Sequence, residues 1–390
     1  HHAFDADDQG FPARIIVSLD RSVGELYAHP AWRAELGHQF LLARTPSGAF
    51  ELRALFHDVQ EAGFPEPIEP IATSTARPPA PTAVAATPPS TSTWKVGQAS
   101  APGTCGELVQ GITGDGHHFH ITCPIRKTAT VSLRVREAQE WQFEGVDPQL
   151  RKAQQAVRLV AEQFGRGAYH VNLDHWSDLH VGKGMGSSTA DIVASARAMA
   201  QALEVELSAD AAAKVATTIE SSDGSMYPGL VAFRQREGTI QQVFEWWPQF
   251  AVVMVVPPVK FNTESADFAG KERLGSEFDQ MLTELAQASE SREGAAFGEA
   301  ATRSASLNQR YLPNPWYELL YAERASLGAS GVNVGHTGTV AGLLFEVPDA
   351  DPDLEREAVL SAGRALRRIR GLLPSEVAVE LTMTPRWSDA

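Results

Sequence analysis

The chain has 390 residues, of which 43% are hydrophobic, and a formal net charge of -15 at pH 7. This length is enough to bury the cores of two or three domains, while the acidic balance argues against a nucleic-acid or anionic-membrane partner and favours a small-molecule substrate. The lack of a long apolar run argues against a membrane span, and a lone pair of cysteines, Cys105 and Cys123, is typical of a reducing cytoplasm rather than a disulfide scaffold.

The N-terminal part of the chain is divided by a segment rich in proline, alanine, threonine and serine. Residues 66–93 read EPIEPIATSTARPPAPTAVAATPPSTST and almost lack large apolar side chains, so they cannot bury a core and predict a disordered, extended linker. Residues 1–65 predict a small α+β module, with strands at 13–19 and 40–43 and a helix at 52–62. This module carries no recognised chemical motif, and its role is left open.

Residues 94–390 mix predicted strands and helices without strict alternation. Apolar alternation predicts strands at 95–100, 118–122, 128–135, 169–173, 230–234, 240–245, 250–256, 332–334, 340–346 and 376–381. Helical periodicity predicts helices at 148–164, 188–203, 209–221 and 353–369, with two or three more within 271–326. This mixture favours an α+β fold over a doubly wound parallel sheet.

The most informative stretch is VGKGMGSSTAD at residues 181–191, which runs into a predicted helix. Glycines let the backbone approach a phosphate closely, and a helix N-terminus adds unpaired N–H groups with a partial positive charge. The hydroxyls of Ser187 and Ser188 add a donor or a magnesium ligand. The residue order differs from a P-loop and from a dinucleotide fingerprint. A plain helix entry capped by one of the serines stays open on the local pattern.

Two other glycine-punctuated stretches accompany this loop. The sequence APGTCGELVQG at 101–111 follows a predicted strand directly, and GVNVGHTGTVAGLLF at 331–345 encloses a small polar turn between two predicted strands. Three such turns in one domain require a common reason. The HHFH run at 117–120 invites a zinc interpretation, but no third ligand with suitable spacing is visible, so we interpret it as a solvated or nucleotide-adjacent hairpin edge.

The three stretches, in this order, resemble the motifs of the GHMP kinase superfamily: an early Pro-Gly motif with a glutamate, a central Gly-x-Gly-Ser-Ser phosphate loop and a late Gly-rich motif. The resemblance covers residues 95–385 and is strongest to the L-threonine kinases of cobalamin synthesis. It implies a two-lobed α+β domain, with a ribosomal protein S5 domain 2-like N-lobe at 94–248 and a ferredoxin-like C-lobe at 249–390. Many members have alanine where Gly186 stands, which affects the stiffness of the loop.

The resemblance implies ATP and Mg²⁺ as cofactors and assigns residues to them. The ATP phosphates would be held by the loop residues Gly184, Met185, Gly186, Ser187, Ser188 and Thr189. Ser188 and Glu220 would ligate Mg²⁺. Asp223 would act as catalytic base on the acceptor hydroxyl, and Lys183 would contact a phosphate oxygen. Simpler alternatives stay open, since an exposed lysine is often only solvated and an Asp-Gly pair often only forms a turn.

A further set of residues is assigned to the acceptor. Glu107 would bind the amino group of an amino-acid substrate, in a pocket lined by Thr104 or Cys105. His336 and Thr337 would lie near the loop and the substrate. The alternatives are that Glu107 is a satisfied carboxylate at the end of a strand and that the other pair are ordinary turn residues.

The function expected from the resemblance is ATP-dependent phosphorylation of the hydroxyl of L-threonine, giving O-phospho-L-threonine for the aminopropanol linker of cobalamin. One rival is another GHMP kinase, acting on homoserine or an isoprenoid alcohol. A second is a catalytically silent nucleotide-binding protein with a regulatory role. The expected partners are ATP and the small substrate, without nucleic acid or membrane, and a homodimer stays open.

Overall fold

The computed structural model describes residues 40–44, 50–54, 93–144, 147, 150–258, 274–336, 339–348 and 352–386. The chain divides into two compact units, His1–Ala86 and Thr87–Ala390. In the first, β1 (Phe40–Arg44) pairs antiparallel with β2 (Phe50–Ala54). β1 confirms the strand predicted at 40–43, whereas β2 replaces the start of the helix predicted at 52–62. The sequence FELRA alternates apolar and charged residues, which is the period of a strand.

Other predictions for the first 93 residues, namely a strand at 13–19 and nearly all of the linker at 66–93, lie outside the described residues.

The second unit is organised around a 10-stranded sheet with the order β12-β9-β11-β10-β3-β4-β6-β5, and β7 pairs with β4 and with β8. Its strands are β3 (Lys95–Ile112), β4 (His118–Ala138), β5 (Gln142–Glu144), β6 (Ala168–Ser177), β7 (Leu230–Arg234), β8 (Thr239–Phe244), β9 (Gln249–Val256), β10 (Gly331–Val334), β11 (Ala341–Val347) and β12 (Ala378–Met383). Among these strands only β5 and β6 pair in parallel, which confirms the α+β prediction.

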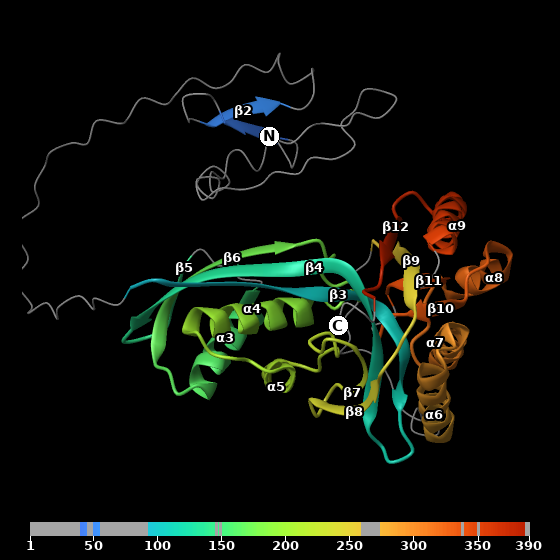
Figure 1. Cartoon of the computed structure of the whole chain (residues 1–390), viewed down its shortest axis with the longest axis horizontal. Coiled ribbons are helices and arrows are strands. Elements are labelled where there is room, and N and C mark those ends of the chain that lie inside the picture. The colour runs from blue at the N-terminus through green and yellow to red at the C-terminus, as the bar shows by residue number, and fades with distance from the viewer. Residues whose placement is uncertain are drawn as a thin grey trace, which may run out of the picture. The chain divides into compact units, whose positions relative to one another are not determined.

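Helices cover this sheet in two groups (Figure 1). The helices are α3 (Arg151–Gln163), α4 (Ser187–Leu203), α5 (Ala209–Ile219), α6 (Gly275–Ser291), α7 (Gly294–Asn308), α8 (Tyr317–Leu327) and α9 (Pro352–Leu372). In the first group α4 lies on β3 and β4, and α3 and α5 pack on α4; in the second, α7, α8 and α9 pack on strands among β9 to β12, and α6 packs against α7. Among the described helices, none has the length and apolar character that a membrane crossing requires.

Helix α4 is the central helix of the first group, and its small side chains explain its position. It is rich in alanine and serine and nearly all of its residues are buried. A Cβ added at Gly97 would lie 1.9 Å from the backbone oxygen of Ala198, so β3 and α4 approach more closely than side chains would permit. The helix that follows the central glycine loop is therefore held rigidly against the sheet.

Strands β3 and β4 are longer than predicted. The pairing of β3 with β4 continues through the motif at 101–111, with register shifts between Pro102 and Thr104, Thr104 and Glu107, and Glu107 and Val109. The expected turn is therefore wrong: the motif is an irregular strand. Its glycine at 106 has a φ of 60°, which fits a bulged strand. Bulges are over-represented next to functional sites, where they change the direction of a side chain.

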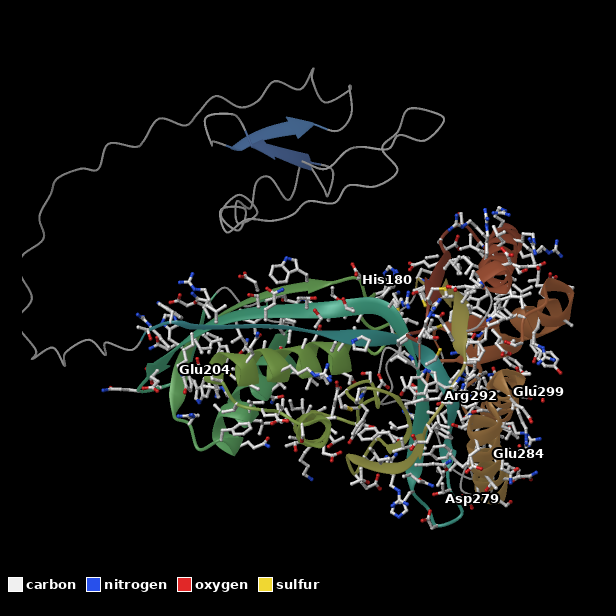
Figure 2. The ribbon with its side chains drawn as sticks, viewed as in Figure 1. His180, Glu204, Asp279, Glu284, Arg292 and Glu299 are labelled. Atoms are coloured by element: carbon white, nitrogen blue, oxygen red, sulfur yellow. The ribbon has the colours of Figure 1, made fainter. Side chains whose placement is uncertain are left out.

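Glu380 of β12, the strand at one edge of the sheet, contacts β4 and the segment that follows β6. His180 Nε2 lies 2.7 Å from one of its oxygens, and Lys127 of β4 donates to the other. Figure 2 shows His180 at the place where the curved strands meet the last strands of the chain. The segment before the central glycine loop and the last strand of the chain are therefore joined by side-chain contacts.

Candidate active site

The central glycine loop enters α4 through residues with left-handed backbone. Gly182, Gly184 and Gly186 have φ values of 71°, 75° and 62°. Gly186 is the N-cap of α4, and no side chain caps the helix there, which leaves the first N–H groups of the helix for a ligand. A Cβ at Gly186 would lie 2.6 Å from Asp223 Oδ2 and 2.9 Å from Thr104 Cγ2, so a side chain at this position would force its neighbours to shift, in addition to the strain of its positive φ.

The three sequence motifs converge around this loop. Thr104 N–H donates to the carbonyl oxygen of Met185 at 2.9 Å, which joins the first motif to the second. In the third motif, Val334 pairs with Glu107, and a Cβ at Gly335 would lie 3.6 Å from the oxygen of Gly184. Met185 itself is buried in the core at 1% exposure, so its side chain anchors the loop. The common reason for the three motifs is therefore a single site.

Ser188 and Glu220 meet at the amine of Lys152, and we call these three residues the lysine-bridged group. Lys152 Nζ donates to Ser188 Oγ at 3.1 Å and to Glu220 Oε2 at 2.5 Å. Glu220 stands at the C-cap of α5, and its other oxygen, Oε1, is buried without a hydrogen-bond partner. The two predicted metal ligands thus converge on one point, where a cationic group already lies.

Asp223 belongs to a second cluster with Glu107 and His120, which we call the carboxylate group. The ligand atoms of the three residues all lie within 4.8 Å of one another. Burial raises the pKa of Asp223 to about 6, and the charge of Glu220 adds to the shift. Burial likewise raises the pKa of Glu107 well above its usual value, with a further contribution from the charge of Asp223. Two carboxyl groups are thus held close together in a place that disfavours their ionised forms.

His336 is connected to the carboxylate group through His120. Its Nδ1 lies 3.1 Å from His120 Nε2 and 2.9 Å from Gln110 Oε1. His336 therefore lies next to the carboxylate group, and its contact with a substrate stays a prediction, whereas Thr337 lies outside the described residues.

Three other residues of the predicted site, Thr189, Lys183 and Thr104, make different contacts. Thr189 accepts a hydrogen bond from Asp223 N–H at 3.3 Å, so its hydroxyl positions the aspartate. Lys183 donates to the carbonyl oxygen of Pro258, which follows β9. Thr104 is buried beside Gly186, with its methyl and hydroxyl groups near the position of a Cβ there.

Both cysteines are buried thiols of the core. Cys105 and Cys123 are free and fully buried, and burial raises the pKa of each thiol. Cys105 Sγ packs against Gly342 of β11, whereas Thr104 packs against Gly186 of the central glycine loop. A thiol of this kind contributes packing rather than a reactive group.

Sequence reasoning missed Lys152 and Gln110, and it interpreted His120 as part of a solvated or nucleotide-adjacent hairpin edge, whereas His120 is buried beside Glu107 and Asp223. Lys152 stands in the first turn of α3, far from any motif, and carried no local signal. The other two did carry a signal, since Gln110 and His120 are direct cross-strand partners. A hairpin prediction with this register would have placed both on the face that carries Glu107.

Comparison with known proteins agrees with this geometry. The family model described as the N-terminal domain of GHMP kinases matches residues 151–230. The L-threonine kinase of Citrobacter freundii is 28% identical over 265 residues, which are 65% of this chain and 88% of the relative. A second L-threonine kinase, from Salmonella typhimurium, is 26% identical over 64% of this chain and 83% of its own length. The chain belongs to the GHMP kinases.

This GHMP kinase also has the fold of solved members. The crystal structure of homoserine kinase from Cytophaga hutchinsonii superposes with a TM-score of 0.54 at 14% identity, covering 75% of this chain and 95% of that one. The likeness shows the two-lobed fold. As a GHMP kinase related to these enzymes, the protein is a phosphotransferase with an alcohol group as acceptor.

Proposed function

We propose that this kinase phosphorylates the side-chain hydroxyl of L-threonine, with ATP as donor and O-phospho-L-threonine as product. The observation that carries the proposal is the carboxylate group beside the glycine loop. Glu107 and Asp223 are buried together, and among the described residues no lysine or arginine forms an ion pair with either. An acceptor that brings its own cation would offset this buried negative charge.

The ammonium group of an amino acid supplies such a cation. Glu107 Oε2 is buried without a hydrogen-bond partner, and a buried polar atom of this kind is commonly satisfied by a ligand. Mevalonate carries a carboxylate and no cation, so the same two carboxyl groups would repel it. The site therefore favours an amino acid over an isoprenoid alcohol. The extent of the similarity to two L-threonine kinases favours threonine over homoserine.

The lysine-bridged group fits a divalent cation. Ser188 Oγ and Glu220 are oxygen ligands of the type that Mg²⁺ prefers, both contact one ammonium group, and Glu220 Oε1 has no partner. These two residues would hold the ion. When bound, Mg²⁺ would neutralise charge on the ATP phosphates. The N–H groups that begin α4 would bind the phosphate oxygens, and Lys152 would be displaced toward them.

Asp223 is the residue that we propose as base. It would accept the proton of the threonine hydroxyl while the hydroxyl oxygen bonds to the γ-phosphorus and the bond from that phosphorus to the β-phosphate oxygen breaks, releasing ADP. A pKa of about 6 leaves the carboxylate ionised at neutral pH and close to the operating range of a general base. We also propose that the product serves the aminopropanol linker of cobalamin, which the sequence resemblance implies.

A substrate panel tests this assignment. Purified full-length chain would be assayed for ADP release with L-threonine, L-serine, L-homoserine and mevalonate, and the product identified by phosphorus NMR. We expect L-threonine to give the highest kcat/KM and a single phosphomonoester signal. A higher kcat/KM for L-homoserine than for L-threonine would mean that homoserine is the acceptor. No phosphorylated product from any alcohol would favour the catalytically silent rival instead.

A further inference from the structure

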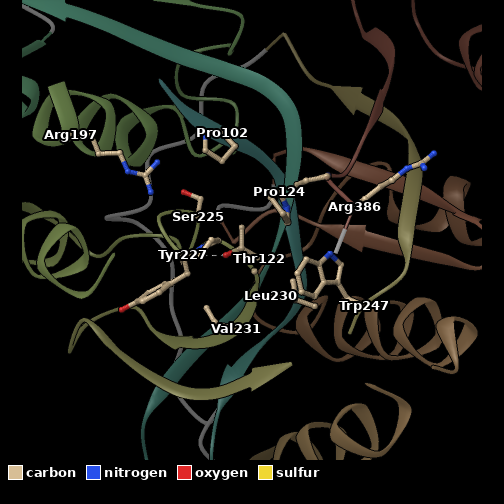
Figure 3. A pocket seen from close by; sticks show the side chains of 14 residues that line it. Pro102, Thr122, Pro124, Arg197, Ser225, Tyr227, Leu230, Val231, Trp247 and Arg386 are labelled. Carbon is tan, nitrogen blue, oxygen red and sulfur yellow. Dashed lines mark hydrogen bonds between the residues drawn. The ribbon is translucent and has the colours of Figure 1, made fainter. Parts of the chain in front are cut away.

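A pocket of about 270 Å³ lies beside the turn that carries Asp223. Figure 3 shows it enclosed by α4, the segment from Gly224 to Val231, and β4. Much of its wall is apolar, formed by Pro102, Pro124, Leu230, Val231 and Trp247. Its volume is near the lower end of the roughly 300–1,000 Å³ found for small-molecule sites. The glycine loop does not contribute to its lining, so it is separate from the proposed phosphate site.

One arginine in this pocket has no carboxylate partner. The guanidinium of Arg197 donates to two backbone oxygens, those of Met226 at 2.6 Å and Ser100 at 3.5 Å. Among the described residues no aspartate or glutamate forms an ion pair with it, and burial lowers the pKa of Arg197. Arg386 also lines the pocket, but its charge is offset by Glu355. A partly buried guanidinium without a counter-ion carries a positive charge that no neighbouring anionic group offsets.

A serine completes the polar side of the pocket. Ser225 is 8% exposed, and its Oγ has no hydrogen-bond partner. In Figure 3 the hydroxyl of Ser225 and the guanidinium of Arg197 point toward the same space. A buried hydroxyl that lacks a partner is uncommon, because leaving such a group unpaired costs free energy.

We propose that this pocket is a second ligand site that binds a small organic carboxylate with an apolar body. The guanidinium and the hydroxyl present N–H and O–H donors to one anionic group, and a carboxylate matches the single uncompensated positive charge. A phosphate dianion would bring more charge than Arg197 offsets. The prolines and Trp247 provide the surface for an apolar body. The proposal does not depend on which alcohol the kinase phosphorylates.

The pocket shares backbone with the catalytic turn. Gly224 follows Asp223 directly, and its N–H donates to Thr122 Oγ1 at 3.4 Å, with both residues in the pocket wall. An occupant held by Ser225 therefore contacts the segment that orients the proposed base.

Calorimetric titration with benzoate and with its uncharged isostere benzamide tests the proposal. The full-length protein would be saturated with ADP and L-threonine, so that these ligands occupy the kinase site. We expect benzoate to bind in the millimolar range and benzamide to bind at least about tenfold more weakly, which is the factor expected for a lost charged hydrogen bond. Arg197→Gln should weaken benzoate binding by a similar factor. Arg303→Gln, which removes an exposed arginine of α7, should leave benzoate binding unchanged.

Several results would overturn the proposal: no binding of benzoate, equal binding of benzamide, unchanged binding in Arg197→Gln, or competition between benzoate and L-threonine. If Arg197→Gln fails to fold, as judged by circular dichroism, Ser225→Leu decides the question. That variant removes the hydroxyl and fills the pocket, so it should abolish the binding of benzoate. Retained affinity in Ser225→Leu would reject the site.

Discussion

The lysine-bridged group and the carboxylate group lie beside the same helix N-terminus, yet their electrostatics are opposite. Glu220 in the first group has Lys152 at 2.5 Å and is partly exposed. Glu107 and Asp223 in the second are buried next to each other, and the basic side chain beside them is His120, whose Nδ1 lies 3.9 Å from Glu107 and 4.0 Å from Asp223. The first group is suited to exchanging one cation for another, and the second lacks a cation until an acceptor brings it. The first group thus offers a cation to the negatively charged ATP phosphates, and the second offers carboxyl groups to the ammonium group of the proposed acceptor.

Among the substitutions in these two groups, Asp223→Asn is expected to have the largest effect on turnover. Without a carboxylate, the second group keeps its shape but cannot accept a proton. We expect kcat to fall by about 10²–10⁴-fold, the range typical of a lost general base. Steady-state turnover with L-threonine is the measurement, and Glu137→Gln on β4 is the matched surface control. Turnover within a factor of about three of the parent would remove Asp223 from the proton transfer.

Ser188→Ala tests the first group. Loss of the hydroxyl removes one of the two oxygen ligands while leaving α4 intact, because no side chain caps this helix. We expect turnover to fall on the order of a hundredfold at limiting Mg²⁺. The melting temperature should change little. Turnover like that of the parent at every Mg²⁺ concentration would exclude Ser188 from the metal site.

Lys152→Met tests whether the amine of Lys152 is only a temporary partner of Ser188 and Glu220 that moves to ATP when the nucleotide binds. If the amine moves to the ATP phosphates, its loss removes one charge-assisted contact, and the KM for ATP should rise about tenfold. Lys214→Met, on the exposed face of α5, is the control for charge alone. An unchanged KM for ATP would mean that Lys152 has a structural role in holding Glu220.

Glu107→Gln tests whether this residue contributes to binding of the acceptor but not to binding of ATP. Removing this carboxyl should raise the KM for L-threonine about tenfold through a lost ion pair with the ammonium group. The KM for ATP should stay the same. A matching rise for both substrates would indicate that the variant disturbs the loop, since Glu107 lies next to Val334 and the third motif.

The pH dependence of stability and turnover has a defined sign. The pKa of Asp223 is raised from 3.8 to about 6, so the folded state binds this proton more tightly than the unfolded state. The free energy of unfolding therefore falls as pH rises through this interval, by on the order of 3 kcal/mol in total. Turnover should rise over the same interval because the base becomes ionised. Urea unfolding of the parent and of Asp223→Asn at both ends of the interval measures the difference, and identical pH profiles would contradict it.

Much of the fold follows from local sequence. The predicted strand at 230–234 coincides with β7, and the predicted helix at 188–203 is α4 extended by one residue at its start. Glycines and polar turns mark these boundaries clearly. The prediction failed at residues 101–111, where proline and glycine indicated a turn. There the pairing of β3 with β4 continues through bulges, so a tertiary contact decides the conformation.

The candidate site was only partly predictable for a related reason. The residues Ser188, Glu220 and Asp223 were found because they stand in or near recognisable motifs. Lys152 comes from another helix, and the contact between His120 and His336 spans 216 positions in sequence. Neither the position of Lys152 beside the site nor the contact between His120 and His336 is marked by a local sequence pattern. A cross-strand register and the packing of α3 against α4 are needed before these residues can be assigned to the site.

The burial of Cys105 and Cys123 has a practical consequence for spectroscopy. Thiols with raised pKa values and no exposure react slowly with maleimides and spin labels. A cysteine pair introduced at exposed positions, such as Lys214 on α5 and Glu299 on α7, would therefore take up labels against little background. Distances between the two helix groups could then be followed by fluorescence transfer while ATP and an acceptor bind, without first replacing either native cysteine.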